Sequence, residues 1–307
     1  MSKLSIIIPV YYNADTLIDC YNDLKENVLS QVNDYELIFI DDGSGDNSWE
    51  ICREIAANDK KVRLIKLSRN FGSHAACYAG LAVCTGDCAT IKSADCQEPP
   101  SLILEMHEKW KQGNKVILAA REGREDGFTD NIFASMYYGM VRKFVSKKMP
   151  KTGFDCYLID RKVIEALKLL DERNSAITLQ ILWTGFKTSV VFYNRLKRQK
   201  GKSRWTLSKK IKLVLDSLVS FSSAPVRFVE CLGILCAIIS VIWGILLITL
   251  RLLGHIEVTG WTTLMVVFLF FSGMIMFSLG ILGEYIWRTL DVAQNRPVYF
   301  IEEEIKY

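Results

Sequence analysis

The 307-residue sequence predicts a chain in two parts, an α/β domain with a mostly parallel sheet and a C-terminal hairpin of two transmembrane helices. Two observations lead to this prediction. Through the first 120 residues, short β-rich runs alternate with stretches of helical periodicity, which is typical of a parallel sheet covered by helices on both faces. Closer to the carboxyl end, two long runs contain no charged residue.

The first part contains five short apolar runs that are predicted to be buried strands. They are Leu4–Val10, Glu36–Asp41, Val62–Leu67, Cys88–Ile91 and Lys115–Ala120. The stretches between them, 15–29, 48–58, 73–83 and 101–112, have helical periodicity. Because ligands of such sheets bind at the carboxyl ends of the strands, the loops that follow the strands are expected to carry the chemistry.

The second part contains the uncharged runs Cys231–Leu250 and Val258–Gly283. About twenty apolar residues span the bilayer core. We therefore predict membrane helices over about 229–250 and 261–283 within a segment 226–289, with a pair of buried core helices as the alternative. Trp261 and Trp287 lie where aromatic residues favour a membrane interface.

The distribution of basic residues predicts how the chain is oriented. Residues 195–212 carry nine Lys or Arg side chains, whereas the connection Arg251–Glu257 carries one. By the positive-inside rule, the domain 1–225 and the tail 290–307 face the cytoplasm. The expected location is the cell (inner or plasma) membrane, with a multi-pass chain and both termini cytoplasmic.

Two further stretches, about 131–148 and 206–222, repeat apolar residues at a spacing of three to four beside basic ones. This pattern predicts juxtamembrane helices that lie in the membrane interface. Helices packed on the protein surface are the alternative.

Composition excludes several classes of protein. Half of the residues are hydrophobic and the net charge is only +4, which excludes a disordered chain. The nine cysteines contain no C-x-x-C pair, so neither a disulfide scaffold nor a structural zinc site is expected. No G-x-G-x-x-G follows the first strand, and Leu196 occupies the place of the first glycine of a P-loop ending at Ser203. No nucleic-acid partner is expected.

Polar residues gather in the loops after four of the predicted strands, at 9–13, 41–46, 68–74 and 93–98. Carboxylates, amides and hydroxyls collected at one sheet edge suit a sugar nucleotide bound with a divalent metal. Mg²⁺ and Mn²⁺ prefer carboxylate and phosphate oxygens, so either ion fits such a site.

Six segments in order, 5–17, 39–50, 67–81, 93–100, 153–161 and 198–205, resemble family 2 glycosyltransferases of the GT-A fold. With two C-terminal spans, the chain is more similar to membrane-bound polyprenyl-phosphate glycosyltransferases. These include bactoprenol glucosyltransferases and, more distantly, dolichyl-phosphate mannose synthases. The resemblance covers nearly the whole chain. It implies an inverting, metal-dependent transferase that moves a sugar from a nucleoside-diphosphate sugar, with uridine expected over guanosine, to polyprenyl (undecaprenyl) phosphate.

The resemblance also implies roles for individual positions. The first two strand-end loops would hold the nucleobase and ribose through Pro9, Tyr11, Asn13, Asp41, Asp42 and Asp46. An ordinary Asx-turn is the alternative reason for the carboxylates at 42–46.

The metal motif of the family has an aspartate where this chain has Ser93. Asp95, supported by Gln97, is still expected to bind Mg²⁺ or Mn²⁺, and Ser93 to reach the ribose or a metal-bound water. An inactive paralogue is the alternative.

Asp155 matches the aspartate that the family places beside the reacting centre, so Asp155 and Asp95 are the expected catalytic residues. A phosphate acceptor has a second pKa of about 6 and is largely a dianion at neutral pH, so it needs little help from a base. Asp155 is therefore expected first to orient the acceptor or a cation. The alternative is a capped turn before Tyr157.

Phosphate contacts are expected from a set of basic and hydroxyl side chains, since two phosphorylated substrates bring much negative charge together. The set is Arg121, Arg198, Ser203 and Arg204. A polybasic segment attracted to anionic lipid is another reading of residues 195–212, and the two can hold together.

Three alternatives stay open for the whole chain: a glycosyltransferase with another lipid or glycan acceptor, a non-catalytic assembly or regulatory paralogue, and an accessory subunit of a transporter. Self-association, for example as a tetramer, is also expected from the resemblance.

Overall fold

The computed structural model describes residues 2–122, 128–170, 176–196, 214, 216–217, 219–253 and 260–306. These residues form two compact units. The first comprises Met1–Ser217 together with Pro297–Tyr307, and the second comprises Leu218–Arg296. The chain therefore leaves the first unit, forms the second, and returns to the first with its last residues.

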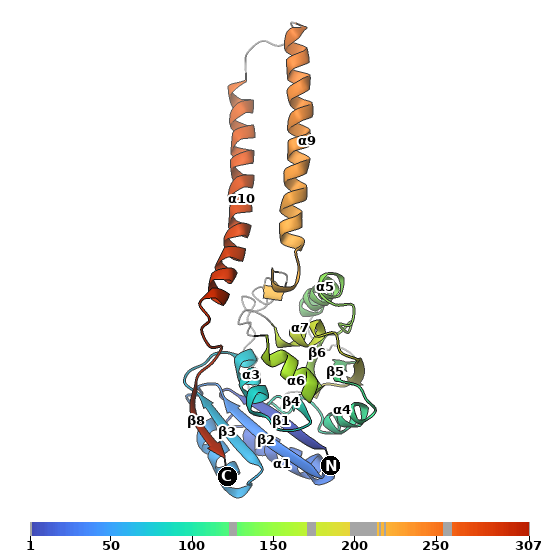
Figure 1. Ribbon diagram of the computed structural model, residues 1–307, viewed down its shortest axis with the longest axis vertical. Coiled ribbons are helices and arrows are strands. Elements are labelled where there is room, and N and C mark those ends of the chain that lie inside the picture. Colours follow the sequence, from blue (N-terminus) through green and yellow to red (C-terminus); the bar gives the residue numbers. More distant parts are fainter. Residues whose placement is uncertain are drawn as a thin grey trace. The chain divides into compact units, whose positions relative to one another are not determined.

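The first unit is built on a sheet of eight strands in the order β7-β5-β6-β4-β1-β2-β3-β8 (Figure 1). The strands β4, β1, β2 and β3 run parallel to one another, β6 is antiparallel to β4 and β5, and β8 is antiparallel to β3. Their bounds are β1 Lys3–Val10, β2 Asp34–Asp41, β3 Val62–Leu67, β4 Cys88–Ile91, β5 Val116–Arg121, β6 Phe154–Asp160, β7 Thr188–Tyr193 and β8 Ile301–Lys306.

The helices of the first unit mostly connect parallel strands, as the alternation in the sequence predicts. They are α1 Leu17–Asn27, α2 Ser48–Asn58, α3 Ser73–Val83, α4 Ser101–Lys111, α5 Phe128–Phe144, α6 Arg161–Lys168 and α7 Ile177–Trp183, with a short 3-10 turn at Leu29–Gln31. The five predicted strands and the first four helices are all present.

Both faces of the central strand β1 are buried, which is why its sequence is a continuous apolar run. Leu4, Ile6 and Ile8 belong to a core shared with α1, α2 and α4. Ile7 faces the other side and contacts α3. A Cβ atom at Gly80 would lie 2.3 Å from Ile7 Cγ2, so only glycine permits α3 to approach the sheet this closely.

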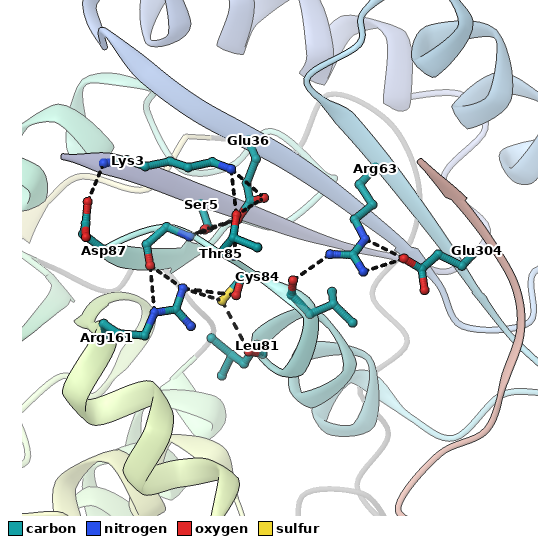
Figure 2. Close-up of polar contacts among 12 residues, drawn as sticks. Lys3, Ser5, Glu36, Arg63, Leu81, Cys84, Thr85, Asp87, Arg161 and Glu304 are labelled. Carbon is teal, nitrogen blue, oxygen red and sulfur yellow. Dashed lines mark hydrogen bonds and ion pairs between the residues drawn. The ribbon is translucent and has the colours of Figure 1, made fainter. Parts of the chain in front are cut away.

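A buried carboxylate holds the amino ends of the strands together (Figure 2). Glu36 on β2 accepts hydrogen bonds from the Ser5 hydroxyl at 2.6 Å and from the Thr85 main-chain N–H at 2.5 Å. Lys3 adds an ion pair at 3.2 Å. Burial alone would raise the pKa of Glu36, but these hydrogen bonds outweigh it and hold the pKa below its usual value. This network lies at the edge of the sheet opposite to the loops that the sequence marks as functional.

The last strand, β8, was not predicted, since residues 290–307 were expected only to form a tail. Ile301–Lys306 pairs with β3, and Arg63 joins the two strands through an ion pair with Glu304 (Figure 2). The acidic sequence of β8 contains no apolar run that would predict a strand. Its place in the sheet depends on β3, more than 200 residues earlier in the chain.

The second unit is formed by the helices α9, Ala224–Leu252, and α10, Trp261–Ala293. Within them, 224–247 and 263–293 are long and apolar enough to cross a membrane. Almost none of these two segments is buried inside this chain, which differs from the buried pair of core helices considered as the alternative. The two helices contact each other, with Cys236 Sγ 3.5 Å from Met274 Sδ. Both helices extend beyond the predicted spans 229–250 and 261–283.

The two predicted interfacial helices have different outcomes. The stretch 131–148 largely coincides with α5, whose Val141 is buried while Met136 is 71% exposed. Most of the stretch 206–222 lies outside the described residues, although 219–221 are helical. An interfacial position stays a prediction for both.

Candidate active site

A cleft of about 970 Å³ opens at the carboxyl ends of the central strands. Its size is at the upper end of the range for small-molecule sites, which is about 300–1,000 Å³. It brings together most of the site residues predicted from the sequence, namely Pro9, Tyr11, Asn13, Asp42, Ser93, Asp95, Gln97, Arg121 and Asp155. Asp41 and Asp46 lie in the same loops but are not part of its lining. Arg198, Ser203 and Arg204 fall outside the described residues.

The loop after β1 presents two aromatic rings beside the cleft. The main-chain N–H of Tyr11 donates to Asn13 Oδ1 at 2.9 Å, which closes a tight turn. Tyr12 adopts a left-handed conformation with φ 55°. The Tyr11 and Tyr12 rings meet edge to face at 4.8 Å, and both are more than a third exposed. A rigid turn with exposed rings can offer a stacking surface for a planar ligand.

The three aspartates at the end of β2 and in the loop that follows all accept hydrogen bonds from main-chain N–H groups. Asp41 accepts from Ser44 at 3.3 Å. Asp46 accepts from Ser48 at 3.2 Å, which is the Asx-turn considered for this loop. Asp42 reaches across to another loop, where it accepts from Phe71 at 2.7 Å and from Gly72 at 2.9 Å. These carboxylates therefore shape the loops.

Asp42 is the member of this trio that also lines the cleft. It is only 3% exposed, and burial raises its pKa against the lowering effect of the two N–H donors. Gly43 beside it has φ 68°, and a Cβ atom there would lie 2.6 Å from the carbonyl carbon of Arg69. The loops after β2 and β3 are thus packed tightly against each other.

The loop after β4 holds the residues expected at the metal. Ser93 Oγ donates to Asp95 Oδ1 at 2.8 Å. Gln97 is held by the segment after β7, since Arg195 donates to its Oε1 at 2.5 Å and its Nε2 donates to the Leu196 carbonyl at 3.2 Å. The side chain of Gln97 is therefore engaged within the protein.

The oxygen donors around Asp95 suit a metal ion that is shared with a bound diphosphate better than one held by protein side chains alone. Among the described residues, no group of three His, Cys, Asp or Glu side chains is arranged to hold a metal ion. Asp95 and the Ser93 hydroxyl are hydrogen-bonded oxygen donors of this loop that line the cleft, and Glu98 lines it too. Mg²⁺ is commonly bound through one or two carboxylates and substrate phosphates, so the set fits a metal shared with a diphosphate.

Asp155 forms an ion pair with Arg121 across the strands β6 and β5. Arg121 is 8% exposed, whereas the Asp155 side chain is 42% exposed and faces the cleft. Gly153, just before β6, has φ 73°, and a Cβ atom there would lie 2.0 Å from Tyr138 Cζ. The close contact with Tyr138 fixes the start of the strand that carries Asp155. Arg121 was expected to contact phosphate, and the structure shows it paired with Asp155.

Three polar residues that line the cleft, His74, Glu98 and Arg195, were not among the individually predicted site residues, although Arg195 belongs to the basic stretch 195–212. Glu98 is buried, its Oε2 lies 4.0 Å from Lys92 Nζ, and burial raises its pKa. Glu98 follows Gln97 directly in the loop after β4, and this position could have predicted that it lies at the cleft. His74 Nδ1 accepts a 3.5 Å hydrogen bond from the Ile177 N–H, a contact that no sequence pattern indicates.

Comparison with known proteins identifies the family. Residues 5–168 match the model of the family described as glycosyl transferase family 2. An uncharacterised glycosyltransferase, YkcC, of Bacillus subtilis (strain 168) is 37% identical over 98% of this chain and 94% of its own. The prophage bactoprenol glucosyl transferase homolog of Escherichia coli (strain K12) is 33% identical over 98% of each chain.

The fold comparison agrees with the sequence comparison. A crystal structure of glucosyl-3-phosphoglycerate synthase from Mycobacterium tuberculosis, in complex with Mn²⁺, UDP and phosphoglyceric acid, superposes with a TM-score of 0.50. It is 15% identical and covers 71% of this chain and 76% of that chain. The predicted GT-A-like fold is thereby confirmed. With a matching family model over more than half of its length and relatives aligned along 98% of it, this chain belongs to glycosyltransferase family 2.

Proposed function

We propose that this glycosyltransferase moves a sugar from a nucleoside-diphosphate sugar, UDP-linked, to a polyprenyl phosphate such as undecaprenyl phosphate. The observation that carries the proposal is the cleft, which collects Asp95, Asp155 and the β1 loop at the carboxyl edge of a family 2 fold. Relatives named bactoprenol glucosyl transferases, aligned along 98% of this chain, support a lipid-phosphate acceptor.

In the proposed reaction, an oxygen of the acceptor phosphate attacks the anomeric carbon and forms the new bond. The bond between that carbon and the nucleoside diphosphate breaks, and the electron pair leaves with the diphosphate. The configuration at the anomeric carbon is inverted. The attacking phosphate is largely ionised at neutral pH, since its second pKa is about 6. The Arg121 ion pair holds Asp155 where it can orient the acceptor, so base catalysis is a secondary role for Asp155.

Asp95 and Ser93, with the diphosphate of the donor, would hold Mg²⁺ or Mn²⁺. Such an ion supplies charge neutralisation for the departing diphosphate. Ser93 cannot contribute a charge, but its hydrogen bond fixes Asp95 Oδ1. Further phosphate contacts are proposed for Arg198, Ser203 and Arg204. Pro9, Tyr11, Asn13 and the loop of Asp41, Asp42 and Asp46 would form the nucleoside pocket.

We propose that α9 and α10 cross the membrane as a hairpin, with the catalytic unit and both termini in the cytoplasm. The length and exposure of the helices support this arrangement. The pairing of β8 with β3 supports it independently. Because the residues before α9 and those after α10 join the same folded unit, both must lie on the same side of any membrane that the two helices cross. Assembly into a homo-oligomer, for example a tetramer, stays a prediction.

Radiolabel transfer tests the proposal. Membranes containing the full chain are incubated with undecaprenyl phosphate and a panel of nucleotide sugars, with and without EDTA. We expect a labelled lipid product from one donor, its loss with EDTA, and its loss in Asp95→Ala. Glu54→Ala, on the exposed face of α2, is the matched control and should transfer normally. Transfer of the label to a different lipid or to a glycan would show that the proposed acceptor is wrong. Absence of any labelled product would favour a non-catalytic role.

A further inference from the structure

The C-terminal strand β8 makes specific side-chain contacts in addition to its ladder with β3. Glu304 binds Arg63, with Nε 2.9 Å from the carboxylate. Glu302 forms a second ion pair with Lys66 at 3.4 Å, in which the Glu302 side chain is 52% exposed. Ile305 packs against the core of the sheet. The tail is therefore docked on the catalytic unit along the whole strand.

The residue just before β8 binds the loop that leads to the cleft. The Ser68 N–H donates to the Phe300 carbonyl at 3.0 Å. The Phe300 ring lies 6.2 Å from the ring of Phe71, measured between centroids, at an angle of 49°. On Phe71, the Arg69 guanidinium stacks at 4.2 Å from the ring centroid. Phe300 thus holds the loop 68–72 through one hydrogen bond and one aromatic contact.

The loop 68–72 leads directly into the part of α3 that lines the cleft. Its Phe71 and Gly72 N–H groups are the donors to Asp42, and Ser73 and His74, which follow directly, line the cleft. A shift of Phe71 would therefore move both the partners of Asp42 and the first residues of α3.

The other end of α3 is also tied to the tail, as Figure 2 shows. Arg63, which pairs with Glu304, donates through Nη1 to the Val83 carbonyl at 2.6 Å. Val83 is the last residue of α3. The helix that lines the cleft with His74, Ala76 and Cys77 is thus held near both ends by contacts that include the tail.

We propose that the tail 297–306 is a positioning element of the nucleotide site, acting through Phe300 and Glu304. The inference rests on the proposed function, because it takes a nucleoside diphosphate as the ligand of the cleft. The docked tail orders the loop 68–72 and α3 before the ligand arrives, so that binding costs less conformational entropy. In the sequence, the tail comes directly after α10. The segment that orders the nucleotide site is therefore the same segment that leaves the second unit.

The test uses the full-length protein in nanodiscs and measures the Kd of UDP and GDP with Mg²⁺. Phe300→Ala and Glu304→Gln are each expected to weaken nucleotide binding by about three- to tenfold, in the range of coupling through shared contacts. Glu302→Gln, on the same strand, removes only the exposed ion pair and should bind as wild type does. Phe300→Leu should restore part of the affinity because it keeps an apolar contact with Phe71.

Steady-state kinetics separate positioning from a loss of folded protein. In Phe300→Ala, the KM of the sugar donor should rise while kcat and the KM of the lipid acceptor stay within about twofold, since only the loop 68–72 and the start of α3 lose a contact. A nucleotide Kd equal to wild type in both Phe300→Ala and Glu304→Gln would overturn the inference and leave the proposed function intact. Wild-type protein that binds no nucleotide would overturn both.

Discussion

Asp42 links the loop after β2 to the loop after β3 through two hydrogen bonds. Replacing it with asparagine tests how much protein stability and nucleotide binding depend on these hydrogen bonds. The carboxylate accepts two main-chain N–H groups, from Phe71 at 2.7 Å and from Gly72 at 2.9 Å, and is 3% exposed. The asparagine side chain in Asp42→Asn would keep one oxygen acceptor, but its NH₂ group would face the second N–H. One partly buried N–H donor would lose its partner.

The expected magnitude follows from these contacts. A hydrogen bond to a charged group contributes about 1.5–3 kcal/mol. Burial raises the pKa of Asp42, so removing its charge also relieves some desolvation cost. The net loss in Asp42→Asn should be about 2 kcal/mol, within the range of about 1–3 kcal/mol for a donor left without its partner. For a domain of about 150–250 residues this lowers Tm by about 4–8 °C.

The assay pairs thermal unfolding of the purified protein with titration of UDP. Asp42→Asn should lower Tm and weaken UDP binding together, because Asp42 lines the cleft and a shift of Phe71 and Gly72 also moves Ser73 and His74, which line it as well. Asp59→Asn is the matched control, since Asp59 accepts hydrogen bonds from Tyr21 and Lys61 away from the cleft. It should lower Tm without changing the Kd of UDP. A variant Asp42→Asn with the Tm and Kd of wild type would refute the reasoning.

Two further predictions concern the opposite edge of the sheet and the basic segment. The pKa of Glu36 is lower in the folded protein than in the unfolded chain, where it is about 4.3. Its ionised form therefore stabilises the fold at pH values above the unfolded pKa, and this contribution is lost as the pH falls through the folded-state pKa. Urea unfolding should show Glu36→Gln less stable than wild type at pH 7, with the gap narrowing below about pH 4; a gap independent of pH would contradict the assignment. Arg198→Ala should raise the KM of a phosphorylated substrate, whereas unchanged kinetics would favour contact with anionic lipid.

Much of the active-site cleft could be predicted from short motifs. Asp95 and Asp155 were expected at one site, and both line the cleft. They could be found because the carboxyl end of a strand is a local feature of the sequence, and the sheet brings such ends to one edge. The partners of a side chain within the protein were harder to predict. Arg121 was expected at phosphate, which stays a prediction, and its ion pair with Asp155 on the neighbouring strand was not foreseen.

The sequence by itself determined the strand and helix order of the first 120 residues, the two apolar helices and the family. Each of these is set by the local period of apolar residues or by a contiguous motif, so no distant contact is needed to recognise it. Only the tertiary structure decided that the tail is a strand, that Asp42 binds Phe71 and Gly72, and that Arg63 pairs with Glu304. These contacts join residues about 30 to 241 positions apart in the sequence. Such residues come within contact distance only when the strands between them have assembled into the sheet, so no local pattern predicts them.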